Sequence, residues 1–224
     1  MGRSLFSRRL LSLSLLAIIL LSQPGCSLFV MAGKALTGDP KVTSKLRQRT
    51  GIDFIEDEKT VLIVCTTPEF LRLENSAIDQ DIIVGVHRRF RRKDIRCIDP
   101  NDVDQWIGSI GGVWDDPSEI AEEFETDYII HINLDQVSYT EENSPAFYRG
   151  NAHGDVKVYA SREINGQKTA YVVFEQEYNS TYPNHHPIPT DSMSQRAFAE
   201  KFTKRMSDEL ARMFYDYRIG EELN

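Results

Sequence analysis

Three consecutive segments alternate strictly between apolar and polar side chains, and this pattern limits the possible folds more than any other feature. The segments are "DYIIHINLDQVSY" (127–139), "NAHGDVKVYAS" (151–161) and "TAYVVFEQEY" (169–178). Alternation with a period of two is typical of a strand that packs on a core through one face and meets water with the other. We therefore expect an antiparallel meander of three strands with one wet face.

The first half of the chain predicts a different mixture of elements. "TVLIVCT" (60–66) is a continuous β-branched run, as expected for a strand buried on both faces. Helical spacing of apolar residues follows over 77–93, and a short strand is expected over 95–98. A second helix is expected to begin after Asp99-Pro100, and a third covers 118–124.

A long amphipathic helix is expected at the C-terminal end. Ser192 and Gln195 have the spacing of a capping box. Large apolar residues then recur on one helical face, and they must be buried against the sheet: Phe198, Phe202, Met206, Leu210, Met213, Phe214 and Tyr217. The predicted fold class is therefore α/β, with the order β-α-β-α-α-β-β-β-α and a mixed sheet in two or three layers.

The first 25 residues have the features of an export signal. Three arginines precede a 12-residue apolar run, Leu10 to Leu21, which contains only two serines. This run is shorter than the roughly 20 residues that cross a bilayer as a helix. We therefore predict a signal peptide over 1–25, an anchor and tether over 26–58, and a single domain over 59–224.

Removal of the signal peptide makes the chain more acidic. The loss of three arginines and no acid moves the formal charge from −8 to −11. Phosphate backbones are bound by clustered Lys and Arg, so this charge argues against nucleic acid as the main partner.

Gly25-Cys26, directly after the apolar run, resembles the bacterial lipobox, although Gln23 and Pro24 depart from its usual pattern. The resemblance implies that Cys26 is the lipid attachment site, with acyl chains such as palmitate, and Ser27 favours sorting to the outer membrane. Several acyl chains hold a protein on a membrane more firmly than one. The alternative is a secreted protein in which Cys26 is an ordinary thiol.

The order of elements also carries a resemblance. A leader, a tether and then β-α-β-α-β-β-β-α resemble the TolB amino-terminal, LpoB and CsgG-type domains of envelope lipoproteins. The stretches "GGVWDDPSEIAEEFETDYIIHINLDQVSYTEENSPAFYRGNAHGDVKVY" and "YPNHHP" are similar to an uncharacterised bacterial lipoprotein family. These resemblances imply a domain with no catalytic residue, which works by contact as an adaptor or assembly factor. A ring-forming subunit of a secretion or lipid-transport assembly is an alternative.

Two groups of residues are candidates for contact with a partner. The basic run "HRRFRRK" (87–93) is a candidate anion contact, with a helix C-terminus as the alternative role; its arginines are Arg88, Arg89, Arg91 and Arg92. The segment 140–151 is expected to be a long hairpin loop, whose aromatics alternatively fold back on the sheet. With the wet face it supplies the candidate partner contacts, which are Phe147, Tyr148, Arg149, His153 and Asp155.

Catalytic chemistry finds little support in the residues. A periplasmic metal-dependent enzyme would use His153, Asp155 and the His185-His186 pair, but no H-x-x-x-H or C-x-x-C spacing occurs. We therefore expect no metal and no other cofactor. Cys65 and Cys97 either form a disulfide, as in other exported domains, or are small buried residues with free thiols.

Overall fold

The computed structural model describes residues 40–112, 114 and 116–220. The predicted signal peptide, Cys26 and most of the predicted tether lie outside these residues. The described chain divides into two units. The smaller unit contains 40–42 and 218–220, where the backbone N–H of Ile219 donates to the carbonyl of Pro40. Strands β1 (Lys41–Val42) and β8 (Tyr217–Arg218) form a two-stranded sheet.

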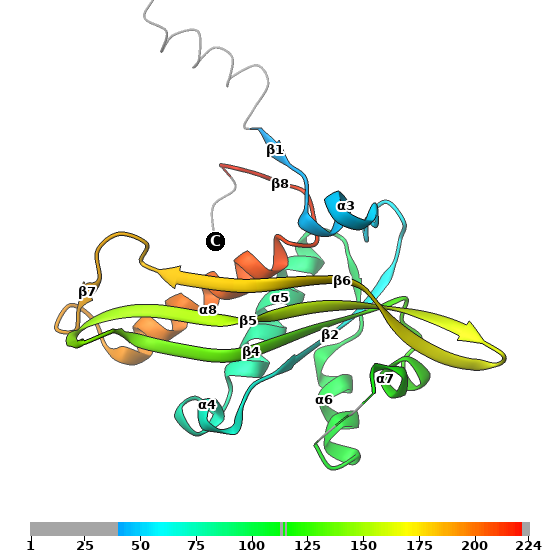
Figure 1. The fold of residues 1–224 in the computed structure, drawn as a ribbon, viewed down its shortest axis with the longest axis horizontal. Helices are drawn as coiled ribbons and strands as arrows, with labels where there is room; N and C mark the ends of the chain where they lie inside the picture. Colours follow the sequence, from blue (N-terminus) through cyan, green and yellow to red (C-terminus); the bar gives the residue numbers. More distant parts are fainter. Residues whose placement is uncertain (1–39, 113, 115, 221–224) are drawn as a thin grey trace, which may run out of the picture. The chain divides into compact units, whose positions relative to one another are not determined.

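The larger unit, Thr43–Tyr217, is an α/β domain and confirms the predicted fold class (Figure 1). Its elements follow the predicted order, with short additional helices and strands. They are α3 (Lys45–Thr50), β2 (Thr60–Thr66), α4 (Glu69–Glu74), α5 (Ile78–Arg92), β3 (Arg96–Cys97), α6 (Pro100–Ser109), α7 (Pro117–Glu123), β4 (Tyr128–Glu141), β5 (Ser144–Ile164), β6 (Gln167–Tyr182), β7 (Ile188–Pro189) and α8 (Gln195–Ala211).

The main sheet is mixed, with strands in the order β3-β2-β4-β5-β6 and β7 paired to β5. Strand β2 runs parallel to β3 on one side and to β4 on the other. The predicted meander β4-β5-β6 is antiparallel throughout. The parallel half requires helical crossovers, and the antiparallel half needs only hairpins.

Two hydrophobic cores lie on opposite faces of β2. Val61 and Ile63 pack with α5 and α8, whereas Leu62 and Val64 pack with α6 and α7. Because successive residues of a strand point to opposite faces, β2 has to be apolar at every position. This explains the unbroken run predicted as a doubly buried strand.

Helix α8 covers the sheet as predicted, but its N-cap lies two residues after the proposed capping residue. The helix ends at Ala211, before Met213, Phe214 and Tyr217 of the predicted stripe. The N-cap is Ser194, whose hydroxyl accepts a hydrogen bond from the N–H of Ala197 at 3.2 Å. The hydroxyl of Ser192 instead donates to the carbonyl of Pro189 at 2.6 Å. Ser194 has the N-cap to N3 relation that satisfies a free N–H of the first turn.

Residues 44–58, predicted as part of the tether, belong to the folded domain. Leu46 in α3 and Phe54 after it are fully buried in the core, and Phe54 stacks on Phe214 with ring centroids 6.1 Å apart. The apolar side chains of this segment are too widely spaced for a helical stripe, so their burial could not be predicted from periodicity.

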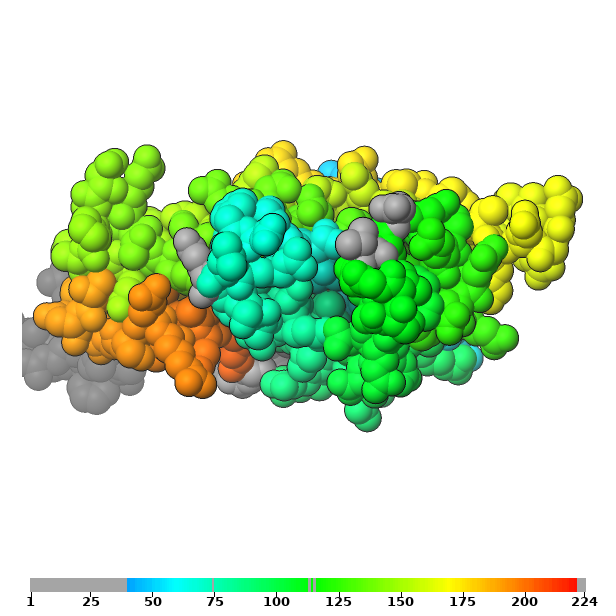
Figure 2. Space-filling model, turned by 90° about the horizontal axis from the view of Figure 1, so that it is seen from below, coloured from blue at the N-terminus to red at the C-terminus, as the bar shows by residue number. Residues whose placement is uncertain are grey.

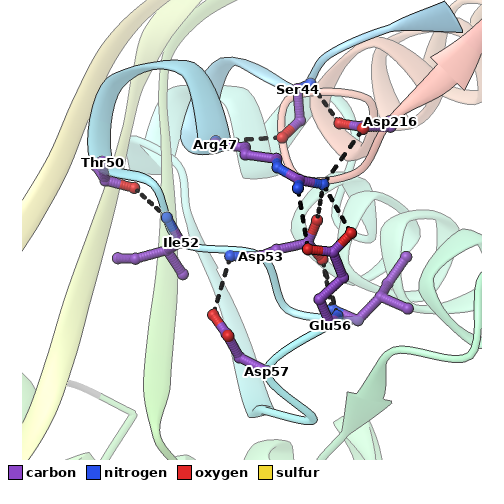
Figure 3. Close-up of polar contacts among 9 residues, drawn as sticks. Ser44, Arg47, Thr50, Ile52, Asp53, Glu56, Asp57 and Asp216 are labelled. Atoms are coloured by element: carbon purple, nitrogen blue, oxygen red, sulfur yellow. Dashed lines mark hydrogen bonds and ion pairs between the residues drawn. The ribbon is translucent and has the colours of Figure 1, made fainter.

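An arginine ties this segment to the end of the domain (Figure 3). The guanidinium of Arg47 lies 2.7 Å from the carboxylate of Asp53, 2.9 Å from that of Glu56 and 3.6 Å from that of Asp216. The N–H of Ser44 donates to Asp216 at 2.9 Å. The hydrogen bond and charge of Glu56 are the main reasons that the pKa of Arg47 is raised. These contacts join residues 172 positions apart in the chain.

The two cysteines of the domain are free thiols and partly buried. Cys97 pairs with Val61, and Cys65 lies four residues further along β2. That offset corresponds to roughly 13 Å of strand. Disulfides join Cα atoms less than about 7 Å apart. The fold therefore excludes the Cys65–Cys97 disulfide and agrees with the alternative of two small buried residues.

A β-bulge in β4 places its backbone against β5. The register shifts between Leu134 and Gln136, opposite Gly154. A Cβ atom at Gly154 would lie 2.0 Å from the carbonyl oxygen of Asn133, which is backbone and cannot rotate away. Glycine is therefore required here by the close approach of the two strands.

Substitution of two glycines should change stability in opposite directions. Gly154→Ala should lower the free energy of unfolding by about 1–3 kcal/mol, because the added methyl group overlaps the β4 backbone. Gly108→Ala, in helix α6 with open space around the Cβ position, should raise it by about 0.5–1 kcal/mol. Urea denaturation of both variants measures this difference, and a loss of stability no greater in Gly154→Ala would contradict the bulge geometry.

Candidate functional site

The outer face of the meander is polar, and it carries four of the five predicted contact residues. Phe147, Arg149, His153 and Asp155 alternate with buried residues along β5 and so share one face. Across the strands, His153 lies opposite Asn179. We define the polar face by eight residues: Asn133, Asp135, His153, Asp155, Lys157, Glu175, Glu177 and Asn179.

Tyr148 is the fifth predicted contact residue, and it lies on the opposite side of the sheet. Its side chain is only 7% exposed and stacks on Phe198 of α8 with centroids 5.0 Å apart. It is therefore a core residue, and the prediction of a contact role for Tyr148 is corrected. The alternative in which an aromatic folds back on the sheet holds for this residue.

The segment 140–151 is also corrected from a loop to strand. Strand β4 ends at Glu141 and β5 begins at Ser144, so that only Glu142 and Asn143 form the turn. Asn143 has a φ of 60°, a conformation that asparagine adopts more readily than most residues. Phe147 is therefore 37% exposed on strand β5 rather than in a loop.

Contacts between neighbouring strands hold the side chains of the polar face in position. His153 Nδ1 lies 2.8 Å from Asn179 Oδ1. Lys157 Nζ lies 3.6 Å from Asp155 and 3.4 Å from Glu175, and the charge of Asp155 is the largest cause of the raised pKa of Lys157. Arg149 forms an ion pair with Glu141 and donates to the carbonyl of His185 at 3.3 Å.

The polar face is acidic. Four carboxylates, those of Asp135, Asp155, Glu175 and Glu177, accompany the single ammonium of Lys157, for a formal charge of −3. Glu177 is 66% exposed and Glu175 is 60% exposed. The arrangement favours a partner that presents positive charge or hydrogen-bond donors.

The arginine run divides into one structural residue and three surface residues. Arg89 is buried, and its Nε lies 3.2 Å from Asp208 of α8. Its other nitrogens donate to the carbonyls of Gly85 at 2.8 Å and Lys204 at 2.9 Å. Arg89 therefore joins α5 to α8, and its predicted anion contact is corrected.

The remaining arginines of the run lie together on the outside of α5. With Val84 and His87 they line a shallow hollow of about 380 Å³; these arginines are Arg88, Arg91 and Arg92. Burial is the largest cause of the lowered pKa of His87, so its ring adds little positive charge to the hollow at neutral pH. An anion contact by these three arginines stays a prediction.

Adjacent arginines of this run should differ sharply in their contribution to stability. Arg89→Gln should lower the free energy of unfolding by about 3 kcal/mol, because it removes one partner of a buried ion pair. Arg88→Gln, on the exposed side of α5, should change it by less than about 0.5 kcal/mol. Chemical denaturation of the two variants provides the comparison, and equal losses would show that Arg89 has no special structural role.

A cavity that the sequence did not predict lies at the carboxyl end of β2. It is about 510 Å³ in volume and opens between α4 and α6 (Figure 2). Strand β3 pairs with one edge of β2 and β4 with the other, and the helices that connect these strands pack on opposite faces of the sheet. Ligands of open α/β sheets bind at such topological switch points. No short motif marks the cavity, because its lining comes from four separate segments.

The lining combines apolar side chains with polar and charged ones. The apolar surface comes from Ile63, Ile83, Pro100, Val103, Ile107 and Trp114. The polar side chains are Thr66, Thr67, Arg72, Asp79, Gln80 and Asp104. Pockets for small ligands likewise combine apolar side chains, which bury the ligand, with polar groups that orient it.

A chain of hydrogen bonds connects the cavity wall to the polar face. Asn133 Nδ2 donates to Asp155 at 3.0 Å and to Asp135 at 2.9 Å, which directs its Oδ1 to the hydroxyl of Thr66 at 3.1 Å. Because that hydroxyl donates to Asn133, it accepts from His131 Nε2 at 2.7 Å. His131 is therefore assigned as the Nε2–H tautomer. The ring of Trp114 packs edge-to-face against the His131 ring, with centroids 4.9 Å apart.

His131 should make the protein less stable in acid. Burial is the main cause that lowers its pKa below the ordinary histidine value, so the unfolded chain takes up a proton more readily than the native state. The associated stability is present above about pH 6.5 and is lost as the pH falls through the lower native pKa. In urea denaturation, the stability gap between wild type and His131→Asn should be larger at pH 8 than at pH 5. A constant gap would contradict this assignment.

Metal-ligand groups and reactive thiols were two of the chemistries that the sequence left open. No group of three His, Cys, Asp or Glu residues among them is arranged to hold a metal ion. Burial raises the pKa of the Cys65 thiol, and it raises that of Cys97 to about 12, so neither is a thiolate nucleophile at neutral pH. None of the described helices has the length and apolarity to cross a bilayer.

Comparisons with known proteins find similarity only among solved structures. No protein-family model matches the chain, and no curated protein matches it. It is similar to the lipoprotein GNA1162 from Neisseria meningitidis at 9% identity and a TM-score of 0.36, over 67% of this chain and 99% of that one. A PelC dodecamer from Paraburkholderia phytofirmans is 10% identical, with a TM-score of 0.38 over 79% of this chain and 96% of that one.

A minor lipoprotein from Acinetobacter baumannii is 7% identical, with a TM-score of 0.29 over 70% of this chain and 90% of that one. At TM-scores this low, these similarities carry no argument about what the chain does. The resemblance to TolB amino-terminal, LpoB or CsgG-type domains stays a prediction.

Proposed function

We propose that this chain is a non-catalytic lipoprotein of the bacterial cell envelope, which binds a protein or cell-wall partner through the polar face. The observation that carries the proposal is a wide acidic sheet surface on which the described part of the chain packs no helix. Helices α6 and α7 cover Leu62, Val64 and Ile129 at one end of this side. Beyond them, His153, Glu175 and Glu177 remain open to solvent.

The polar face suits binding because its side chains are already ordered. Asp155 is held by Asn133 and by Lys157, and His153 is held by Asn179. Side chains fixed in this way lose little conformational freedom when a partner binds. The negative charge then selects a complementary basic surface and speeds its approach.

Anchoring at the membrane is the second part of the proposal. The basic start, the apolar run and Gly25-Cys26 support cleavage before Cys26 and attachment of lipid to its sulfur. The chain would then face the periplasm from the outer membrane, and the residues after Cys26 would connect the lipid to the domain.

The anchor is tested by comparing the full chain with its Cys26→Ala variant. Wild type should fractionate with membranes and should yield an amino-terminal peptide with the mass of a diacylglyceryl cysteine. Cys26→Ala should be soluble after export and should still recover the same partners from envelopes. A bare Cys26 thiol on the mature native protein would overturn the anchor without affecting the polar face.

Partner binding is tested by reversing one charge on the polar face. Glu177→Lys should weaken binding to the captured partner by about tenfold, because it removes a negative charge and adds a positive one. Glu200→Lys is the matched control, since Glu200 on α8 is 65% exposed and Glu177 is 66% exposed. Equal binding by the two variants, measured by calorimetry with the purified partner, would exclude the polar face as the binding surface.

A further inference from the structure

We infer that the cavity at the end of β2 binds a small zwitterion with an apolar side chain, the chemistry of a hydrophobic amino acid or short peptide. This inference does not depend on the proposed function. It rests on the position of the cavity and on the charged and apolar side chains that line it.

Position is the first argument. The cavity lies where β2 ends between β3 and β4, with α5 and α6 leaving toward opposite faces of the sheet. Each helix packs mainly on its own core, and the cavity lies between them. A volume of about 510 Å³ is within the usual size of small-ligand sites.

The lining carries opposite charges that form no ion pair with each other. Among the described residues, the guanidinium of Arg72 forms no ion pair or hydrogen bond, although Arg72 and Asp79 both line the cavity. The Asp79 carboxylate accepts a hydrogen bond from the N–H of the adjacent Gln80 at 2.9 Å. Cys65 lines the same cavity as Asp79.

These charges select among ligands. Arg72 offers paired donors to a carboxylate, and Asp79 offers an acceptor to an ammonium group. A second acid, Asp104, accepts from Gln80 Nε2 at 2.7 Å and brings the formal charge of the lining to −1. A phosphate dianion would meet two carboxylates and one guanidinium, whereas a zwitterion places each of its charges against an opposite one.

The apolar lining accounts for the apolar part of the ligand. Ile63, Val103 and Trp114 contribute aliphatic and aromatic surface to the cavity. The hydroxyl of Thr67 is buried and makes no hydrogen bond with the described residues. Thr67 lines the cavity, so its hydroxyl is a candidate for one further polar contact with the ligand.

The dipeptide Phe-Leu is a suitable probe, because it has both free termini and two apolar side chains. Calorimetry with the full chain in mild detergent should show saturable binding of Phe-Leu. N-acetyl-Phe-Leu and Phe-Leu amide should each bind at least about tenfold more weakly, which corresponds to the loss of one charge contact. Inorganic phosphate should not compete. Absence of binding, or equal binding of a peptide blocked at both ends, would overturn the inference.

Two variants assign the charges to residues. Arg72→Gln should remove the preference for the free carboxylate, and Asp79→Asn should remove the preference for the free amine. Arg196→Gln is the control, because Arg196 is 90% exposed on α8, outside the cavity. Thermal unfolding verifies that each variant is folded. If both variants keep the wild-type preferences, the dipeptide binds elsewhere and the site is wrong.

Discussion

Successive side chains of β2 enter two different cores, and the rest of the domain is arranged around this constraint. Val61 and Ile63 require cover from α5 and α8, while Leu62 and Val64 require cover from α6 and α7. Burial of each such side chain contributes roughly 1.5–3 kcal/mol. A strand in this position must have helices on both faces and a neighbouring strand on each side. The cavity at its carboxyl end is a consequence of that arrangement.

The meander β4-β5-β6 is covered by a helix along one face only. Helix α8 supplies a full apolar stripe to one face of the meander, which buries Phe198, Phe202 and Met206. The short helices α6 and α7 cover only the β2 end of the other face. The strands extend well beyond them, so that their outward residues are polar and bond across the strands. The outward side of these strands beyond α6 and α7 therefore carries no core residue.

The packing of α5 on α8 divides the arginines of the run 87–93 into one buried residue and three surface residues. Arg89 points toward α8 and meets Asp208, while its neighbours on the helix point to solvent. The carboxylate of Asp208 also forms an ion pair with Arg212, whose Nε lies 2.5 Å away, so two cations share this buried carboxylate. Such a site gives α5 and α8 a fixed register, because an unpaired charge in the core would be costly.

Local periodicity was sufficient to predict most of the elements. The strand over 60–66 matches β2, the helix predicted over 77–93 differs from α5 by one residue at each end, and the alternating segments form the meander. These signals are local, since the spacing of apolar residues within one element reports which of its faces is buried. The same alternation placed His153 and Asp155 on the wet face correctly.

Tertiary structure alone decided which candidate residues are accessible. Tyr148 and Arg89 are buried because α8 packs against them, and α8 is more than 40 residues away from either in the sequence. The cavity was invisible for the same reason, because Cys65, Arg72, Asp104 and Trp114 come together only when β2 is placed between two crossovers. Amino-acid order determines the period of each element, whereas the packing of distant elements determines which side chains can meet a ligand.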